Sequence, residues 1–252
     1  MSIATVEAGL KVPHGFFTRS GGVSEGPFAS LNCSLSGADA REAVLENRAR
    51  AARHLGAAPV MLVGLTQVHG PDVATVETAW RPGEGPRADA MVTDRPGIAL
   101  GIVTADCAPV LFADEAAGVI GAAHAGWRGA VDGVLEATLA AMVALGARRD
   151  RIAAAVGPCI GQASYEVTAS LRDPVLARDA ANARFFAPGM DAEHWQFDLA
   201  GYCVHRLAAA GVASAIATGQ DTLAEPDRFF SHRRRTLSKA GPIGHQISVI
   251  TL

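Results

Sequence analysis

The chain has 252 residues, of which 49% are hydrophobic and 19% are charged, and its formal net charge is −3 at pH 7. This length is enough to bury one sizeable hydrophobic core or two small ones. The absence of a basic excess or a Lys/Arg tail argues against a nucleic-acid partner. The short run HRRR at 232–235 is the exception, and composition predicts a solvated basic turn there.

The N-terminal sequence MSIATVEAGLKVPHGFF lacks the basic segment and the long apolar stretch of a secretion signal. No window approaches the roughly 18 apolar residues of a membrane-spanning helix. We therefore expect a cytoplasmic protein without a membrane partner. The chain has no CxxC pair, and in a reducing compartment we expect free thiols at its four cysteines, which are Cys33, Cys107, Cys159 and Cys203.

Strand-like and helix-like patterns alternate along the chain, and they predict a mixed α/β fold with a single domain over residues 1–252. Residues 16–40 are rich in Gly, Ser and Asn, which predicts an ordered loop packed on the body. The expected elements that follow are a helix over 41–55, strands over 60–70 (ending at His69), 72–77 and 97–107, an antiparallel strand pair over 109–114 and 118–126, a helix over 127–147, a strand over 151–157, a helix over 198–211 and a terminal strand over 245–252.

Three residues with metal-ligand chemistry, His69, Cys107 and His124, are each expected at a strand end next to a turn. Two imidazoles and one thiolate suit zinc, and three protein ligands leave a fourth position open for water. A metal in such a site can lower the pKa of its bound water to near 7. The sequence separations of 38 (107 − 69) and 17 (124 − 107) residues are not those of a local zinc motif, so two core histidines and a buried cysteine remain an alternative.

Asp106 directly precedes Cys107 in an otherwise apolar segment, where a carboxylate is costly unless it is paired. It can orient a ligating imidazole or transfer protons, and the plain alternative is a turn Asp that accepts nearby backbone N–H groups. The stretch GWRG at 126–129 adds glycines at a strand-to-helix junction, where backbone N–H groups can approach an anion. Arg128 can contribute a guanidinium there, and Trp127 is either a stacking face or a buried anchor.

Seven blocks of this sequence, in order, resemble the YfiH-type proteins, also called laccase-domain or multicopper polyphenol oxidase family proteins. The resemblance covers nearly the whole chain from about residue 15, and its blocks are FFTRSGGVSEGPFASLN, VLENRARAARHLG, TQVHG, ADCAPVLFAD, HAGWRG, GPCIGQASYEV and FFSHRR. It implies two mixed β-sheets packed face to face with helices outside. It also implies that His69, Cys107 and His124 bind one metal, with zinc expected and copper in an older assignment.

The resemblance further implies that Arg19 contacts the substrate or phosphate. Asn47 and Arg48 match an NR pair of the family, although both can equally be structural. The FFSHRR block departs from the expected pattern, so His232 is assigned no role. Cys33 and Cys203 are expected to be incidental, and Cys159 stays open between packing and catalysis.

The activity that the resemblance implies is that of a purine nucleoside phosphorylase, acting on adenosine, inosine and methylthioadenosine, with adenosine deaminase activity. The expected partners are therefore a small-molecule nucleoside and phosphate. Asp106 is the expected proton-transfer group of the deamination. The groups expected to hold phosphate are Arg19, Arg128 and Arg233 or Arg234.

Three alternatives remain at the sequence level. Cys107 can be a thiolate nucleophile of an amidase or hydrolase, with His124 as its base. Copper-dependent phenol oxidation is another, but eight histidines in total are too few for a trinuclear cluster plus a blue-copper site. The last is a non-catalytic binding module, which the open ligand position disfavours.

Overall fold

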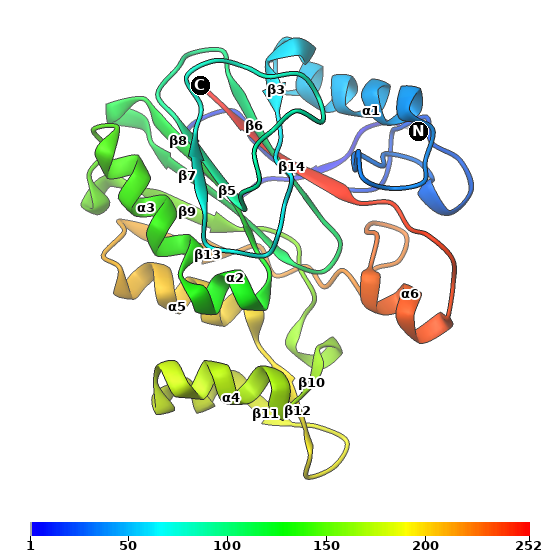
Figure 1. Cartoon of the computed structure of the whole chain (residues 1–252), viewed down its shortest axis with the longest axis vertical. Coiled ribbons are helices and arrows are strands. Elements are labelled where there is room, and N and C mark those ends of the chain that lie inside the picture. Colours follow the sequence, from blue (N-terminus) through cyan, green and yellow to red (C-terminus); the bar gives the residue numbers. More distant parts are fainter. Residues whose placement is uncertain (1) are drawn as a thin grey trace.

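The centre of the molecule consists of two mixed β-sheets in the computed structural model, which describes residues 2–252 (Figure 1). The first sheet has five strands in the order β1–β2–β14–β6–β3. Strand β14 lies antiparallel to β2 and β6, whereas β3 is parallel to β6. The bounds are β1 Thr5–Val6, β2 His14–Phe17, β3 Leu62–Val63, β6 Ala99–Thr104 and β14 Gln246–Thr251.

The second sheet has six strands in the order β13–β9–β7–β8–β5–β4. The predicted antiparallel pair is confirmed as β7 and β8, and the turn between them is stabilised because the Asp114 carboxylate accepts the Ala117 N–H. Gly118, with a φ of 61°, ends this turn in a conformation that favours glycine. The bounds are β4 Val73–Thr75, β5 Ala90–Thr93, β7 Ala108–Asp114, β8 Val119–Ala125, β9 Ala153–Val156 and β13 Ser214–Ala217.

The two sheets pack face to face, as expected, because alternate residues of each strand point into a shared apolar layer. Leu100 and Ile102 of β6 meet Leu111 of β7 and Ile120 of β8 in this layer, and all four are fully buried. Helices α3 and α5 pack on the outer face of the six-stranded sheet, and α1 packs on the outer face of the other. The helices are α1 Arg41–His54, α2 Trp127–Asp132, α3 Val134–Ala144, α4 Ala169–Arg178, α5 Leu199–Ala209 and α6 His232–Ser238.

A small antiparallel sheet lies apart from the two central sheets, together with α4 (Figure 1). Its strand order is β10–β12–β11, and the bounds are β10 Glu166–Thr168, β11 Phe186–Pro188 and β12 His194–Phe197. Stacked rings of Phe186 and Phe197 connect it to the core, since Phe197 is fully buried. In the described part of the chain, none of the helices is both long and apolar enough to cross a membrane.

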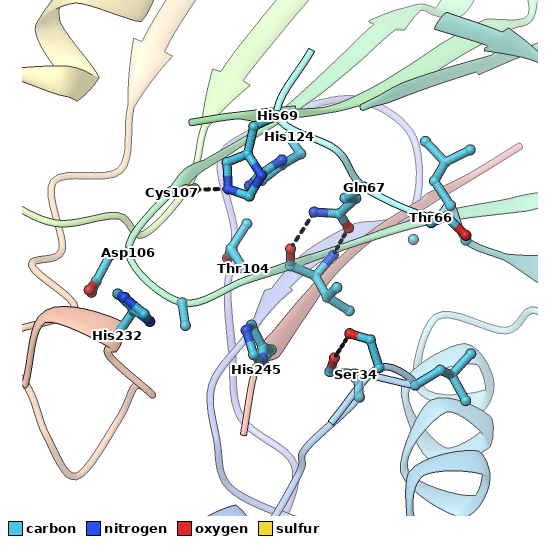
Figure 2. Close-up of a pocket in the computed structure, with 18 of the residues that line it drawn as sticks. Ser34, Thr66, Gln67, His69, Thr104, Asp106, Cys107, His124, His232 and His245 are labelled. Atoms are coloured by element: carbon cyan, nitrogen blue, oxygen red, sulfur yellow. Dashed lines mark hydrogen bonds between the residues drawn. The ribbon is translucent and has the colours of Figure 1, made fainter. Parts of the chain in front are cut away.

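The prediction of one strand over residues 60–70 was wrong. A 3-10 turn over Pro59–Met61 precedes the two-residue strand β3, and the backbone then leaves the sheet. The reason is that the Gln67 side chain takes the hydrogen bonds that the backbone of a continuing strand would make to β6. Its amide donates to the Val103 carbonyl at 2.9 Å and accepts the Val103 N–H at 3.0 Å (Figure 2). The freed backbone then carries His69 toward the edge of the second sheet.

The single helix predicted over 127–147 is two helices. Gly133, at φ 101°, ends α2 and begins α3. The apolar spacing that suggested one helix is real, because Val131, Val134 and Leu135 are all buried. Spacing alone does not reveal a change of helix direction at a glycine.

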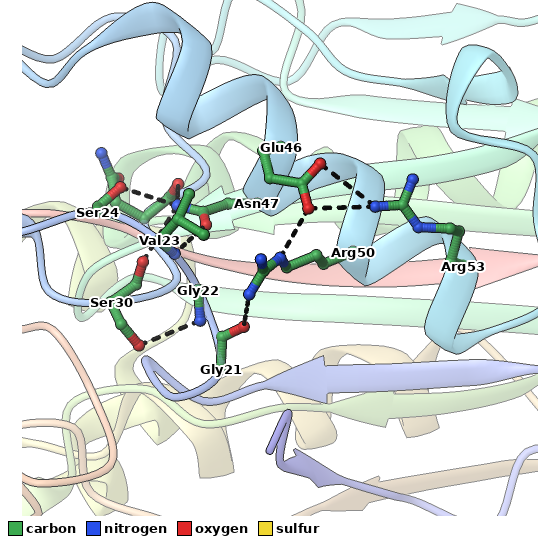
Figure 3. A network of polar contacts seen from close by, with 10 residues as sticks. Gly21, Gly22, Val23, Ser24, Ser30, Glu46, Asn47, Arg50 and Arg53 are labelled. Atoms are coloured by element: carbon green, nitrogen blue, oxygen red, sulfur yellow. Dashed lines mark hydrogen bonds and ion pairs between the residues drawn. The ribbon is translucent and has the colours of Figure 1, made fainter. Parts of the chain in front are cut away.

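Residues 18–40 form an ordered loop, as predicted, whereas Phe16 and Phe17 of the predicted loop belong to β2, and α1 holds the loop in place (Figure 3). Asn47 of α1 is fully buried, and its Nδ2 donates to Ser24 Oγ and to the carbonyls of Ser30 and Asn32. Its Oδ1 accepts the Val23 N–H at 2.8 Å. Asn47 is therefore a structural anchor, which resolves the role of the first residue of the NR pair.

Candidate metal centre

The structure brings His69, Cys107 and His124 together. Their ligand atoms all lie within 4.8 Å of one another, although the residues come from the 64–70 segment, the β6–β7 turn and β8. Cys107 Sγ lies 4.0 Å from His69 Nε2, and the two imidazole rings meet edge to face at 4.7 Å (Figure 2). Tetrahedral zinc places such donors about 3.3 to 3.7 Å apart. The donor set therefore fits one divalent ion after a small approach of the side chains.

A cavity of about 690 Å³ opens from this cluster. That volume lies within the range of small-molecule sites, which is about 300 to 1,000 Å³. Two aromatic side chains, Trp127 and Tyr165, line it together with Thr104, His232 and His245. The cavity therefore combines metal-capable donors, ring surfaces and polar groups.

Asp89 is a functional residue that the sequence analysis missed. It is fully buried, and its Oδ1 lies 2.7 Å from His124 Nδ1, which leaves Nε2 of that ring free to face the cluster. The same carboxylate accepts the backbone N–H groups of Val68 and Gly70, on both sides of His69. One carboxylate thus orients both imidazoles, as outer-shell groups do in zinc sites. In the sequence, the only hint of this role is that the Asp89 carboxylate directly precedes the apolar residues 90–92.

Two residues of the site have an unusual backbone. His69 has a φ of 64° and Asp106 a φ of 89°, in the left-handed region that non-glycine residues rarely adopt. Such conformations persist only where the surroundings hold them, and they concentrate at functional sites. The bonds from Val68 and Gly70 to Asp89 hold His69 in this way.

The electrostatics couple Cys107 to His124. Burial raises the pKa of the Cys107 thiol, but the charge of His124 and hydrogen bonds to both histidines outweigh burial and lower the pKa to about 6. Burial lowers the pKa of His124, whereas Cys107 and Asp89 raise it to about 9. In the metal-free protein the pair is therefore thiolate and imidazolium near neutral pH, and the thiolate is the form that ligates a metal.

Asp106 lies beside this cluster and lines the cavity, but its carboxylate is also a structural hub. It accepts hydrogen bonds from Thr222 Oγ1 at 2.6 Å, Ser231 Oγ at 3.0 Å and the Arg233 N–H at 2.6 Å. The alternative prediction for Asp106 was a turn residue that accepts backbone N–H groups close in sequence. The donors observed are instead more than 110 residues away. Asp106 therefore joins the β6–β7 turn to the start of α6, where a negative charge is favourable.

The HRRR run is not a solvated turn, contrary to the prediction, because it forms the start of α6. Arg233 lines the cavity and donates twice to the Glu166 carbonyl at 2.9 Å. The Arg234 guanidinium is bound by three backbone carbonyls, which belong to Phe229, Thr222 and Leu223.

The two remaining arginines with a predicted role, Arg19 and Arg128, lie outside the cavity lining. The Arg19 guanidinium donates to the carbonyls of Ala29 and Pro226 and lies over the Phe230 ring. Arg128 is exposed and stacks over the ring of Trp127. Neither is among the described residues that line the cavity. A contact of either one with phosphate stays a prediction.

The three other cysteines are buried in apolar cores: Cys33 beneath α1, and Cys159 and Cys203 around α5. Burial raises the pKa of the Cys159 thiol well above its ordinary value. An unreactive, protonated thiol favours packing as the role of Cys159.

Gly126 lies so close to His69 and Cys107 that there is no room for a side chain at this position. A Cβ at this position would lie 3.0 Å from His69 Cδ2 and 3.1 Å from Cys107 Sγ. We expect Gly126→Ala to push both groups apart and to lower metal affinity at least about tenfold, as the loss of an outer-shell partner does. Metal titration followed by competition with a chelator measures this change. Gly241→Ala, where a Cβ meets nothing within 4 Å, is the control and should bind metal normally.

Comparison with known proteins assigns the chain to a family. Residues 13–252 match the family described as "Multi-copper polyphenol oxidoreductase laccase". The "Purine nucleoside phosphorylase ORF3" of Streptomyces griseus is 44% identical over 229 residues, covering 89% of this chain and 90% of that protein. The "Purine nucleoside phosphorylase" of Deinococcus radiodurans is 45% identical over 253 residues, covering 96% and 90%.

A solved structure supports the same relationship. The crystal structure of Bacillus licheniformis hypothetical protein YfiH superposes with a TM-score of 0.91 at 30% identity, covering 99% of this chain and 96% of that one. The predicted fold class is thus confirmed, with its mixed sheets and outer helices. The chain therefore belongs to the multi-copper polyphenol oxidoreductase laccase family, as its resemblance to the YfiH-type proteins predicted.

Proposed function

We propose that this chain is a purine nucleoside enzyme that carries out phosphorolysis of adenosine, inosine and methylthioadenosine and also deaminates adenosine. The observation that carries the proposal is the meeting of His69, Cys107 and His124 at one end of a cavity of about 690 Å³. The names of the Streptomyces griseus and Deinococcus radiodurans relatives support an enzyme of the phosphorylase kind. The family description alone suggests copper chemistry instead.

In this proposal His69, Cys107 and His124 hold one zinc ion, with copper as the alternative metal. A divalent ion held by these three residues would supply Lewis-acid chemistry toward a substrate or water oxygen. Asp89 fixes the His124 tautomer, so that the ligating nitrogen carries a free lone pair. Trp127 and Tyr165 offer ring faces to the purine, since both line the cavity.

Each of the two reactions forms one bond and breaks another. In phosphorolysis a phosphate oxygen forms a bond to C1′ of the ribose, the C1′–N9 bond breaks, and the electron pair leaves with the purine, which gains a proton. In deamination a water oxygen forms a bond to C6, the C6–N6 bond breaks, and ammonia leaves. Asp106 is the proposed proton-transfer group, because it lines the cavity next to Cys107.

Product analysis tests the proposal. The purified protein is incubated with adenosine in the presence and absence of phosphate, and the products are separated by chromatography. We expect adenine and ribose 1-phosphate only with phosphate, and inosine under both conditions. If micromolar protein loaded with zinc yields neither adenine nor inosine, the proposed function is wrong. The phenol-oxidase alternative is assayed in parallel on protein loaded with copper.

The second candidate is a hydrolase in which Cys107 attacks an amide and His124 acts as its base. The lowered pKa of the Cys107 thiol, about 6, is the observation that favours it. A bound metal and a free nucleophile exclude each other at the same sulfur. Metal content and thiol reactivity therefore separate this candidate from the purine enzyme.

A further inference from the structure

Arg48 is a buried cation in the cavity lining that lacks a counter-charge and most of its hydrogen-bond acceptors among the described residues. Two arginines line the cavity, Arg48 and Arg233, and the second is held by the Glu166 carbonyl. Arg48 is only 5% exposed, and its Nη1 donates to the Cys33 carbonyl at 3.3 Å. Nε and Nη2 have no hydrogen-bond partner among the described residues. Its charge also lacks a carboxylate, since none of the salt bridges found among residues 2–252 includes Arg48.

A buried guanidinium without a counter-charge is unfavourable, and native structures keep one only where something compensates for it. The fold nevertheless reserves the space for Arg48. At Gly64 a Cβ would come within 3.0 Å of Arg48 Nη2, so the glycine leaves room for the guanidinium. Burial lowers the pKa of Arg48, which means that the site itself disfavours the charge. The missing compensation is therefore expected from a ligand.

The surroundings of Arg48 offer further hydrogen bonds to an oxyanion. The Cys33 carbonyl that binds Arg48 is followed by Ser34 and Ser36, whose hydroxyls lie 3.1 Å apart (Figure 2). Both serines line the same cavity as the metal donors, and so does Thr66. Hydroxyl groups beside a guanidinium are typical partners of phosphate.

We propose that Arg48, with Ser34 and Ser36, forms a phosphate subsite in the cavity that also contains the His69–Cys107–His124 cluster. This inference rests on the proposed function, and the phosphate is the attacking oxyanion of the phosphorolysis. The sequence-based assignment of phosphate to Arg19, Arg128 and Arg233 or Arg234 stays a prediction, and of these four arginines Arg233 alone is among the described residues that line the cavity. Asn47 and Arg48 then have different roles: the first anchors the loop and the second binds the anion.

The subsite is tested with Arg48→Met, which removes the charge and keeps an unbranched apolar side chain. This variant should fold at least as stably as the wild type, because an uncompensated buried charge is lost. We expect its KM for inorganic phosphate in phosphorolysis to rise at least about tenfold, the loss of a strong charge-assisted contact. The kcat at saturating phosphate is measured alongside, because an effect confined to KM marks the loss of phosphate binding and not the loss of the fold. Arg53→Met, on the exposed side of α1, is the matched control and should leave the phosphate KM unchanged.

A binding measurement keeps the inference independent of turnover. Inorganic phosphate should raise the melting temperature of the wild type and of Arg53→Met, but not that of Arg48→Met. AMP is tested in a parallel arm, because a nucleotide carries the same oxyanion. Stabilisation by AMP without stabilisation by inorganic phosphate contradicts a free-phosphate site. Equal responses of Arg48→Met and the wild type to inorganic phosphate overturn the inference, even if the purine chemistry is confirmed. Phosphate binding that depends on Arg48 in a protein without purine activity refutes the proposed function alone.

Discussion

Replacing His124 with Ala should reduce bound zinc from near one ion per chain to a small fraction of that. His124 is a buried donor of the cluster, and its ring is already held by Asp89 at 2.7 Å. With one of three protein ligands removed, affinity should fall by more than about 100-fold, beyond the loss from an outer-shell change. Metal analysis of the purified proteins measures this. His54→Ala, an exposed histidine on α1, is the control and should keep its metal.

The same variant separates a metal enzyme from a Cys–His hydrolase. In metal-free wild type the pKa of Cys107 is about 6, so alkylation of this thiol should slow as pH falls through 6 and level off above about 7. In His124→Ala the charge that lowers this pKa is gone, the pKa rises, and alkylation at pH 7 should slow. Zinc should protect Cys107 in the wild type. A wild-type protein that is active without metal and inactivated by alkylation would contradict the metal centre.

Asp89→Asn should weaken metal binding about 10- to 100-fold, the usual effect of losing an outer-shell carboxylate. The change is almost isosteric, but an Asn amide can donate to His124 Nδ1. That bond puts the imidazole proton on Nε2, which removes the lone pair that faces the cluster. The N–H groups of Val68 and Gly70 also lose their charged acceptor, so His69 is held less firmly. Metal titration at a pH where the variant is fully folded measures the loss.

The control for Asp89→Asn is Asp114→Asn. Asp114 is also buried and charged, but it binds Arg151 and the turn after β7. Both variants should lower the melting temperature because each removes a buried, hydrogen-bonded carboxylate. Only Asp89→Asn should lower metal affinity. Equal metal affinity of Asp89→Asn and wild type would show that the carboxylate does not orient the ligands.

The sequence by itself determined the fold class, most of the elements and the three donors of the cluster. The strand pair β7–β8 was predictable because apolar runs on both sides of a short polar turn leave few other arrangements. The donors were recognised from their chemistry and from the resemblance, since the sequence predicts a strand end and a turn next to each of His69, Cys107 and His124. The same patterns failed where a side chain or a glycine redirects the backbone, at Gln67 and at Gly133.

Only the tertiary structure decided which polar groups surround that cluster. Asp89 and Asp106 look alike in the sequence, each a carboxylate beside an apolar run. Asp89 binds the His124 ring and the backbone next to His69, whereas Asp106 accepts hydrogen bonds from the start of α6. Likewise, five arginines were open to a role at the site. Backbone carbonyls bind the guanidiniums of Arg19 and Arg234 but leave Arg48 largely unpaired. The physical reason is that a charged group's role depends on its partners, and these lie up to 207 residues away in the chain. Local patterns encode burial and period, whereas such pairings exist only after the sheets have packed.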